Sequence, residues 1–215
     1  MIPAYLKRIL ITQQNLFLMK KYPIYFGLIL SFSFFSIHNT AAQKKVQKFT
    51  ISKVIRASAD QVWAIVGEDY GAIANSHPKI IRSNYVNGSL KGGEGAERVC
   101  FFNEKGTKFV KEKQLNYDPE KYSFKNTIYQ TGKFPLNEEY SYAMYKVEPI
   151  DAQHSRFIFE MQYRTKPAFM GSFTKGSFKK MIRNYAIAIE HHVRTGEKVT
   201  KENFKKIKKE SKAST

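Results

Sequence analysis

The hydrophobic pattern of this chain changes once, near residue 166, and that change restricts the folds that it can adopt. From residue 48 to residue 165, apolar and polar residues alternate in short runs, which predicts strands because successive strand side chains point to opposite faces. From Phe178 to Val193, apolar residues instead recur every three or four positions, which predicts one long amphipathic helix. The sequence therefore predicts an α+β fold in which a series of strands precedes one long helix.

Two short helices are predicted directly after the first strand, residues 48–57. Ser58 can cap the first of them, and Gln61 stands three residues later, where its side chain can complete a capping box. The second is predicted at residues 70–75 and ends before Pro78, because a proline disfavours helical geometry in the residue that precedes it.

Six further runs with strand periodicity follow, separated by turn residues such as Asn87-Gly88 and Asp118-Pro119. Turn signals at this spacing are typical of an antiparallel meander. The six predicted strands are residues 79–88, 96–106, 108–118, 121–131, 138–151 and 154–165.

Residues 1–42 have the pattern of a secretory signal segment. Lys20 and Lys21 precede an uncharged apolar run at residues 24–37, and small residues ending at Ala42 offer a cleavage point. The run is shorter than the ~20 residues that span a bilayer, and a retained membrane anchor is the alternative. We expect a start that is either Met1 or Met19, cleavage near Ala42, and an exported protein that is periplasmic or secreted.

The chain carries a formal net charge of +18, and its C-terminal residues are rich in lysine. We expect a ligand-binding domain at residues 43–196 and a basic tail at residues 197–215. Such a tail suits an anionic membrane surface, and a solvated tail without a partner is the alternative. Nucleic acid is not an expected partner, because an exported protein rarely meets it.

The order of the predicted elements, and four stretches within it, resemble the START-like superfamily (SRPBCC) in its polyketide cyclase/dehydrase and lipid-transport branch. The stretches are SADQVWAIVGED, GGEGAERVC, KEKQLNYDPEKYSF and RNYAIAIEHHVRTGE, and the resemblance covers about residues 48–195. It implies a helix-grip fold, in which a curved, seven-stranded antiparallel sheet holds the last helix and a ligand cavity lies between them.

Strand alternation, read together with this resemblance, places many aromatic side chains on the face toward the cavity. Aromatic walls with a few phenol donors suit a small hydrophobic or amphipathic ligand such as a sterol, polyketide, fatty acid or quinone. The alternative is that the aromatic side chains fill the cavity. His77 is expected at the cavity mouth, either as a ligand contact or as a solvent-facing turn residue. The expected lining residues are Glu112, Tyr122, Phe124, Ile128, Tyr140, Tyr142, Met144, Phe159, Met161, Tyr163 and Tyr185.

Glu112 is the candidate catalytic residue, because the resemblance implies that a glutamate of this strand faces the cavity. It could accept a hydrogen bond from a ligand hydroxyl, or act as a base together with a tyrosine such as Tyr142. Lys113 and Gln114 depart from the family's motif, so a surface carboxylate paired with a neighbouring lysine is the alternative. Arg98 is expected to point outward, with a contact to an anionic headgroup as the alternative.

The sequence predicts neither a cofactor nor a metal site. Cys100 is the only cysteine, and its apolar neighbours predict a buried, unreactive thiol. His191 and His192 are about 100° apart on the predicted helix, and no acid or cysteine completes a metal set with them. The expected function is an exported, non-enzymatic carrier of a small hydrophobic ligand, with an enzyme of the cyclase or dehydratase type as the alternative.

Overall fold

The computed structural model describes residues 46–213. Its strands are β1 (Gln47–Ile55), β2 (Arg82–Tyr85), β3 (Glu97–Phe101), β4 (Phe109–Asp118), β5 (Ser123–Thr131), β6 (Tyr142–Pro149) and β7 (Ser155–Tyr163). Its helices and helical turns are α3 (Ala59–Trp63), η2 (Ala64–Glu68), η3 (Tyr70–Asn75), η4 (Glu138–Tyr140), η5 (Ala168–Met170), α4 (Gly171–Thr195) and α5 (Phe204–Ala213).

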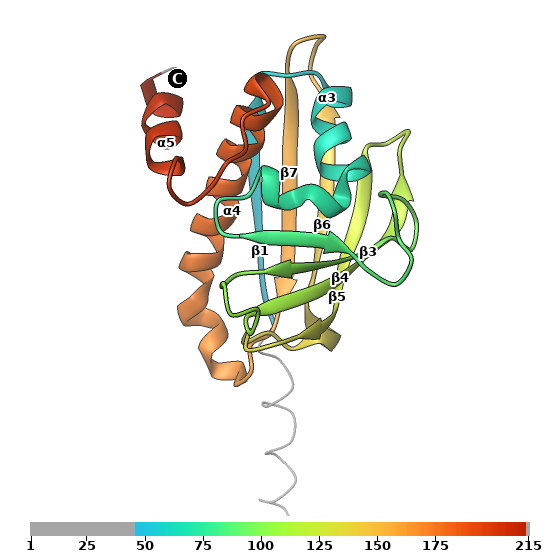
Figure 1. Ribbon diagram of the computed structural model, residues 1–215, viewed down its shortest axis with the longest axis vertical. Helices are drawn as coiled ribbons and strands as arrows, with labels where there is room; N and C mark the ends of the chain where they lie inside the picture. Colours follow the sequence, from blue (N-terminus) through green and yellow to red (C-terminus); the bar gives the residue numbers. More distant parts are fainter. Residues whose placement is uncertain (1–45, 214–215) are drawn as a thin grey trace, which may run out of the picture. The chain divides into compact units, whose positions relative to one another are not determined.

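The seven strands form one antiparallel sheet in the order β1-β7-β6-β5-β4-β3-β2. The predicted meander from β2 to β7 is confirmed, and β1 completes the sheet by pairing with β7. Helix α4 packs along β1 and β7, and α3 lies beside α4 and packs against β6 and β7 (Figure 1). This arrangement is the predicted helix-grip fold. None of the helices within residues 46–213 combines the length and the apolar composition that crossing a bilayer requires.

Helix α4 buries the apolar stripe that its sequence predicts. Phe178, Ile182, Tyr185 and Ile189 are each 8% exposed or less. Burying a large apolar side chain contributes about 1.5–3 kcal/mol, so this stripe is a major source of the attachment of α4 to the sheet. The helix ends at Gly196, whose φ of 72° is a left-handed conformation that favours glycine.

The short helices after β1 also follow their sequence signals. Ser58 caps α3, and its capping box with Gln61 is complete. The chain continues through a π-helical turn, η2, into a 3-10 turn, η3, that occupies the predicted residues 70–75. A Cβ at Gly67 would lie 2.6 Å from the Trp63 indole, so the buried tryptophan explains the glycine inside η2.

The glycine-rich connection between β2 and β3 packs against η2 and β4. A Cβ at Gly92 would lie 2.2 Å from the Gly67 carbonyl oxygen, so a larger residue would displace the backbone. The Gly92 amide donates to the Glu68 carbonyl at 2.8 Å, and the Gly93 amide donates to Gln114 Oε1 at 2.8 Å. Gln114 is fully buried and donates to the Gly67 carbonyl at 3.1 Å, which fixes η2 to the sheet.

The C-terminal residues form a helix where the sequence predicted a basic tail. Helix α5 lies beside the C-terminal part of α4 (Figure 1), and Ile207 and Val199 are buried in a small cluster with Ala188. Lys208 Nζ donates to Asn184 Oδ1 of α4 at 2.9 Å. The few apolar residues between the lysines attach this segment to α4. They are too widely spaced among charged residues for the sequence to predict a packed helix.

Candidate ligand-binding site

The inner face of β3 and β4 carries a buried ion pair. Arg98 and Glu112 are register partners, and Arg98 Nε donates to Glu112 Oε2 at 2.8 Å. Arg98 is 2% exposed and Glu112 is 9% exposed. A second guanidinium nitrogen donates to the Tyr70 carbonyl at 2.6 Å, and the guanidinium carbon lies 3.8 Å from the centre of the Tyr70 ring. A carboxylate, a carbonyl and an aromatic face thus surround the buried charge of Arg98.

The inward direction predicted for Glu112 is confirmed, and the outward direction predicted for Arg98 is wrong. Residues that stand opposite one another in an antiparallel pair share a face, so the partner of an inward glutamate also points inward. The surface-carboxylate alternative is wrong as well. Lys113 pairs with Glu97 at 2.5 Å instead, and these two residues are register partners one position along the same strands.

Hydroxyl, amide and thiol groups lie around this ion pair. The Tyr70 hydroxyl donates to Asn126 Oδ1, and both side chains are buried. Cys100 Sγ lies 3.6 Å from Glu112 Oε2, and burial raises the pKa of this thiol to about 12. The predicted burial of Cys100 is confirmed. Burial also raises the pKa of the Tyr145 hydroxyl. At neutral pH, the uncharged groups around the ion pair therefore keep their protons.

His77 is buried, at 3% exposed, and is not the solvent-facing turn residue that one alternative described. Its ring lies 4.8 Å from that of Tyr185, and its Nδ1 accepts hydrogen bonds from the backbone amides of Lys79 and Ile80. Burial lowers the pKa of His77 to about 3, so the imidazole is neutral and carries its proton on Nε2. His77 therefore fixes the turn that leads from η3 to β2.

Four of the predicted lining residues, Phe124, Phe159, Tyr163 and Tyr185, point inward from the sheet or α4 and contact other aromatic rings there. Phe124 stacks on Tyr145 with ring centres 4.5 Å apart, and Tyr145 meets Phe159 at 4.8 Å. Tyr163 meets Phe178 of α4 at 4.7 Å. These rings pack against one another between the sheet and α4, which favours the alternative in which aromatic side chains occupy the expected cavity. The inward residues, each 8% exposed or less, are Phe124, Phe159, Met161, Tyr163 and Tyr185, and Ile128 is 6% exposed.

The predicted inner face of β6 is wrong. Ala143 is the register partner of Met161, and Tyr142 is the partner of Gln162. Because Met161 faces the core, Ala143 does so too, and Tyr142 lies on the outer face, where its hydroxyl donates to Gln162 Oε1 at 3.3 Å. Both faces of β6 carry tyrosines, so composition did not decide between them. The misassigned residues are Tyr140, Tyr142 and Met144, and the inward ones are Ala143, Tyr145 and Val147.

Tyr122 holds the start of β5 to helix α3. It has a left-handed φ of 47°, its hydroxyl donates to Asp60 Oδ1, and its ring lies 5.9 Å from that of Trp63. It is therefore a structural residue at the rim of the core.

Sequence reasoning missed the inward role of Arg98 and did not list Tyr70, Asn126 or Tyr145. One signal was available for Asn126, since it shares its strand face with Phe124 and stands as a polar residue among apolar ones. The position of Tyr70 beneath Arg98 depends on tertiary packing, and no local pattern reports it.

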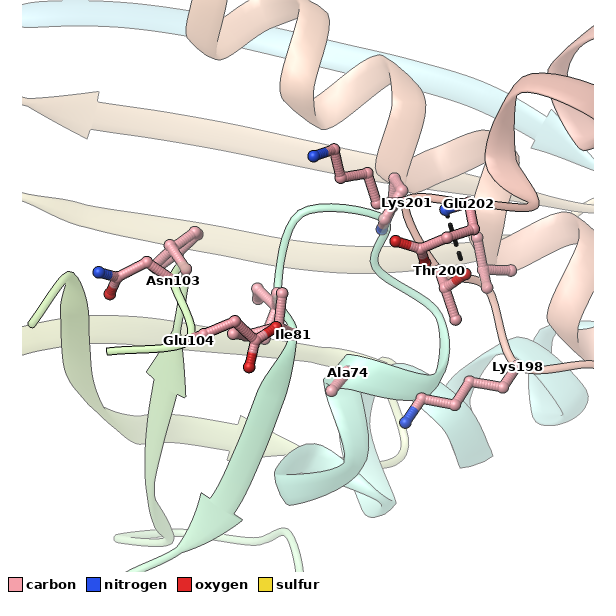
Figure 2. Close-up of a pocket in the computed structure, with 12 residues that line it drawn as sticks. Ala74, Ile81, Asn103, Glu104, Lys198, Thr200, Lys201 and Glu202 are labelled. Carbon is pink, nitrogen blue, oxygen red and sulfur yellow. Dashed lines mark hydrogen bonds between the residues drawn. The ribbon is translucent and has the colours of Figure 1, made fainter. Parts of the chain in front are cut away.

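A groove, here called the mouth groove, lies where the core reaches the surface, and its volume is about 360 Å³. Ile80 belongs to the core, and Phe102 packs against it. Lys198 and Lys201 approach from the connection between α4 and α5, and Glu104 approaches from the connection between β3 and β4 (Figure 2). The lining residues are Ala74, Pro78, Ile80, Ile81, Phe102, Asn103, Glu104, Lys198, Val199, Thr200, Lys201 and Glu202.

The geometry of the mouth groove suits an amphipathic molecule. Its apolar floor can take a hydrocarbon or ring, and its rim presents ammonium, carboxylate and hydroxyl groups. The α4–α5 connection is held in place because the Val199 amide donates to the Asn75 carbonyl at 2.8 Å. Within residues 46–213, no three His, Cys, Asp or Glu side chains gather in a way that would hold a metal ion.

Comparisons with known proteins agree with this fold. The family described as polyketide cyclase / dehydrase and lipid transport matches residues 46–190. No curated protein sequence gives a significant match. Norcoclaurine synthase from Thalictrum flavum, solved with dopamine and hydroxybenzaldehyde, aligns with a TM-score of 0.54 at 17% identity over 74% of this chain and 91% of that one.

Two further solved structures show the same similarity. A solution structure of a Thermobifida fusca protein aligns with a TM-score of 0.55 at 20% identity, over 70% of this chain and 93% of that one. An aromatase/cyclase from Streptomyces aligns with a TM-score of 0.52 at 11% identity, over 69% of this chain and 91% of that one. At these identities the structural neighbours establish the fold alone. The family match covers well over half of the sequence, and the chain therefore belongs to the polyketide cyclase/dehydrase and lipid transport family (SRPBCC).

Proposed function

We propose that this protein is a carrier that binds a small amphipathic ligand at the mouth groove. The observation that supports the proposal most is the composition of the groove, in which Ile80 and Phe102 form an apolar floor continuous with the core. The rim presents the ammonium groups of Lys198 and Lys201 together with the carboxylates of Glu104 and Glu202, which suits a ligand with a strongly polar end. Because aromatic rings pack against one another between the sheet and α4, the apolar part of the ligand lies against this floor.

The burial of Glu112 and its contact with Arg98 favour a carrier over an enzyme. Its Oε2 atom accepts a hydrogen bond from Arg98 at 2.8 Å, and its side chain is almost fully buried. Arg98 therefore already occupies this oxygen, and a substrate group would have to displace the guanidinium to reach it.

Native mass spectrometry followed by organic extraction tests the proposal. The protein released by an exporting host should carry, or take up from a lipid and polyketide mixture, a discrete mass that extraction removes. Phe102→Ser should abolish that uptake. Phe101→Ser is the matched control, because Phe101 packs against Phe109 and Arg82 and does not line the groove. Uptake that is equal in the two variants would exclude the groove as the site.

An enzyme of the cyclase type is the second candidate, and the buried polar cluster favours it. Norcoclaurine synthase and the aromatase/cyclase share the fold and are enzymes by their names. Glu112 would act as the base, and Tyr145 replaces Tyr142 as its partner, because Tyr142 lies on the outer face. In a preparation with turnover, Glu112→Gln should slow the reaction by about 100-fold or more. Unchanged turnover would remove this candidate.

We also propose that the protein is exported. The pattern of residues 1–42 supports this proposal, and that segment lies outside the described residues. N-terminal sequencing of the protein from the periplasm or medium of an exporting host should begin near Gln43. Recovery of the intact chain in the membrane fraction would favour the retained anchor.

An anionic membrane surface is the proposed partner of the basic C-terminal segment. In α5, Lys205, Lys206, Lys209 and Lys212 are exposed, which supports electrostatic attraction to acidic lipids. Binding to vesicles that contain phosphatidylglycerol should weaken steeply as the salt concentration rises.

A further inference from the structure

Three large apolar side chains are exposed together where η5 leads into α4. Phe169 is 57% exposed, Met170 is 37% exposed and Phe173 is 81% exposed. We call these three residues the apolar tip. Single exposed apolar residues are common on protein surfaces, but three within five consecutive residues need a reason, because each costs free energy in water.

The backbone beneath the apolar tip is held rigidly. Thr165 Oγ1 donates to the Pro167 carbonyl at 2.7 Å, and the buried Tyr163 hydroxyl donates to the Gly171 carbonyl at 2.7 Å. Thr174 Oγ1 also donates to the Gly171 carbonyl, at 3.1 Å. The tip is therefore presented in one backbone conformation, so that binding through it requires little ordering of the chain.

The surface that continues from the tip is basic. Between residues 165 and 189 the chain has five cationic residues and no acidic one, and Lys166 pairs with Glu138. Lys180 follows Phe173 by seven positions, which places both on one face of α4. Helix α5 covers the next part of this face through its contact with Asn184, and its exposed lysines extend the positive charge.

We propose that the apolar tip inserts into the interface of an anionic lipid bilayer. Phenylalanine and methionine side chains enter the boundary between headgroups and acyl chains, while the long lysine side chains of α4 and α5 reach the phosphates. A second copy of the chain suits this face less well, because a symmetric contact would bring the same cations together. The inference rests on the proposed contact with anionic surfaces and adds the residues that enter the lipid.

A tryptophan placed at the tip reports insertion directly. The native Trp63 is the only tryptophan and is 2% exposed, so it contributes a constant background. In Phe173→Trp, vesicles of phosphatidylcholine and phosphatidylglycerol should shift the emission to shorter wavelength and protect it from iodide. Leu90→Trp is the matched control, because Leu90 is 89% exposed on the connection between β2 and β3 and should not respond. A bound protein with an unshifted Phe173→Trp emission would overturn the inference.

Vesicle sedimentation separates insertion from attraction by charge alone. Phe173→Ala should reduce partitioning into anionic vesicles by roughly tenfold, and Leu90→Ala should leave it unchanged. Lys205→Glu combined with Lys209→Glu should also reduce it, and more strongly at low salt. If only the lysine variant loses binding, the contact is electrostatic and insertion is refuted.

The same variants distinguish the remaining outcomes. If Phe173→Ala turns a dimer into a monomer, the tip is an interface between copies and the lipid inference fails. Ligand uptake at the mouth groove should be the same in Phe173→Ala and in the parent protein. A loss of uptake in Phe102→Ser with vesicle binding retained would therefore leave this inference standing by itself.

Discussion

Removing one partner of the buried Arg98–Glu112 pair should destabilise the protein severely. In Glu112→Leu, the 2% exposed guanidinium of Arg98 keeps its charge and loses the carboxylate that lies 2.8 Å away. Breaking a buried ion pair in this way costs about 3–5 kcal/mol, a large part of a typical stability of about 5–15 kcal/mol. For a domain of this size, that loss corresponds to a fall in Tm of roughly 6–20 °C.

A double-mutant cycle measures whether the loss comes from the pair. Urea unfolding of Glu112→Leu, of Arg98→Met and of the double variant gives the three free energies of unfolding. The double variant should recover most of the loss, because two apolar side chains leave no uncompensated charge. The outer pair Glu97–Lys113 joins the same two strands, and its lysine side chain is 40% exposed, so Lys113→Met should cost at most about 1 kcal/mol. Equal costs for the inner and outer variants would refute this description of the inner face.

Three further predictions follow from single residues. Burial lowers the pKa of His77 from 6.5 to about 3, so below pH 6.5 the unfolded chain binds a proton that the folded protein excludes. Stability should therefore be lost as the pH falls from 6.5 toward 3, by about 1.4 kcal/mol per pH unit, and His77→Asn should show a shallower slope in urea titrations. Gly92→Ala should destabilise the fold by more than about 1 kcal/mol, because its Cβ would meet the Gly67 carbonyl. Gly176→Ala lies in open space on α4 and should instead stabilise the fold by about 0.5–1 kcal/mol in thermal unfolding. A Gly92→Ala protein more stable than Gly176→Ala would contradict the packing. Cys100, with a thiol pKa of about 12 and no exposed surface, should resist a thiol reagent at pH 8 until denaturant is added, and rapid native labelling would show that the inner face opens.

Local signals in the sequence predicted most of the fold. The capping box at Ser58, the turn residues between strands and the apolar stripe of α4 act over a few residues each, and each appears in the structure as expected. Helix α5 is different, because its stability comes from burying Ile207 against α4 rather than from a strong pattern of its own. Because the segment is rich in charge and has few apolar residues, its sequence does not predict the contact with α4.

The inner face was less predictable because it depends on strand register. Alternation shows which residues share a face, but not which face is turned inward when both carry aromatic or polar groups, as in β6. Pairing with Met161 settles the direction of Tyr142, and pairing with Glu112 settles that of Arg98. Neither pairing can be read from one strand alone, which is why the inward direction of Arg98 was missed, whereas Glu112 was identified through the family resemblance.

Nuclear magnetic resonance can show whether a lipophile binds at the mouth groove. The compound recovered by extraction is titrated into isotope-labelled protein, and the amide and methyl resonances are followed. A ligand in the mouth groove should produce saturable shifts centred on Ile80, Ile81, Phe102 and Val199, with smaller changes at the lysines of the rim. Shifts confined to the outer surface of α4 and α5, or no shifts at all, would contradict a ligand site at the mouth groove.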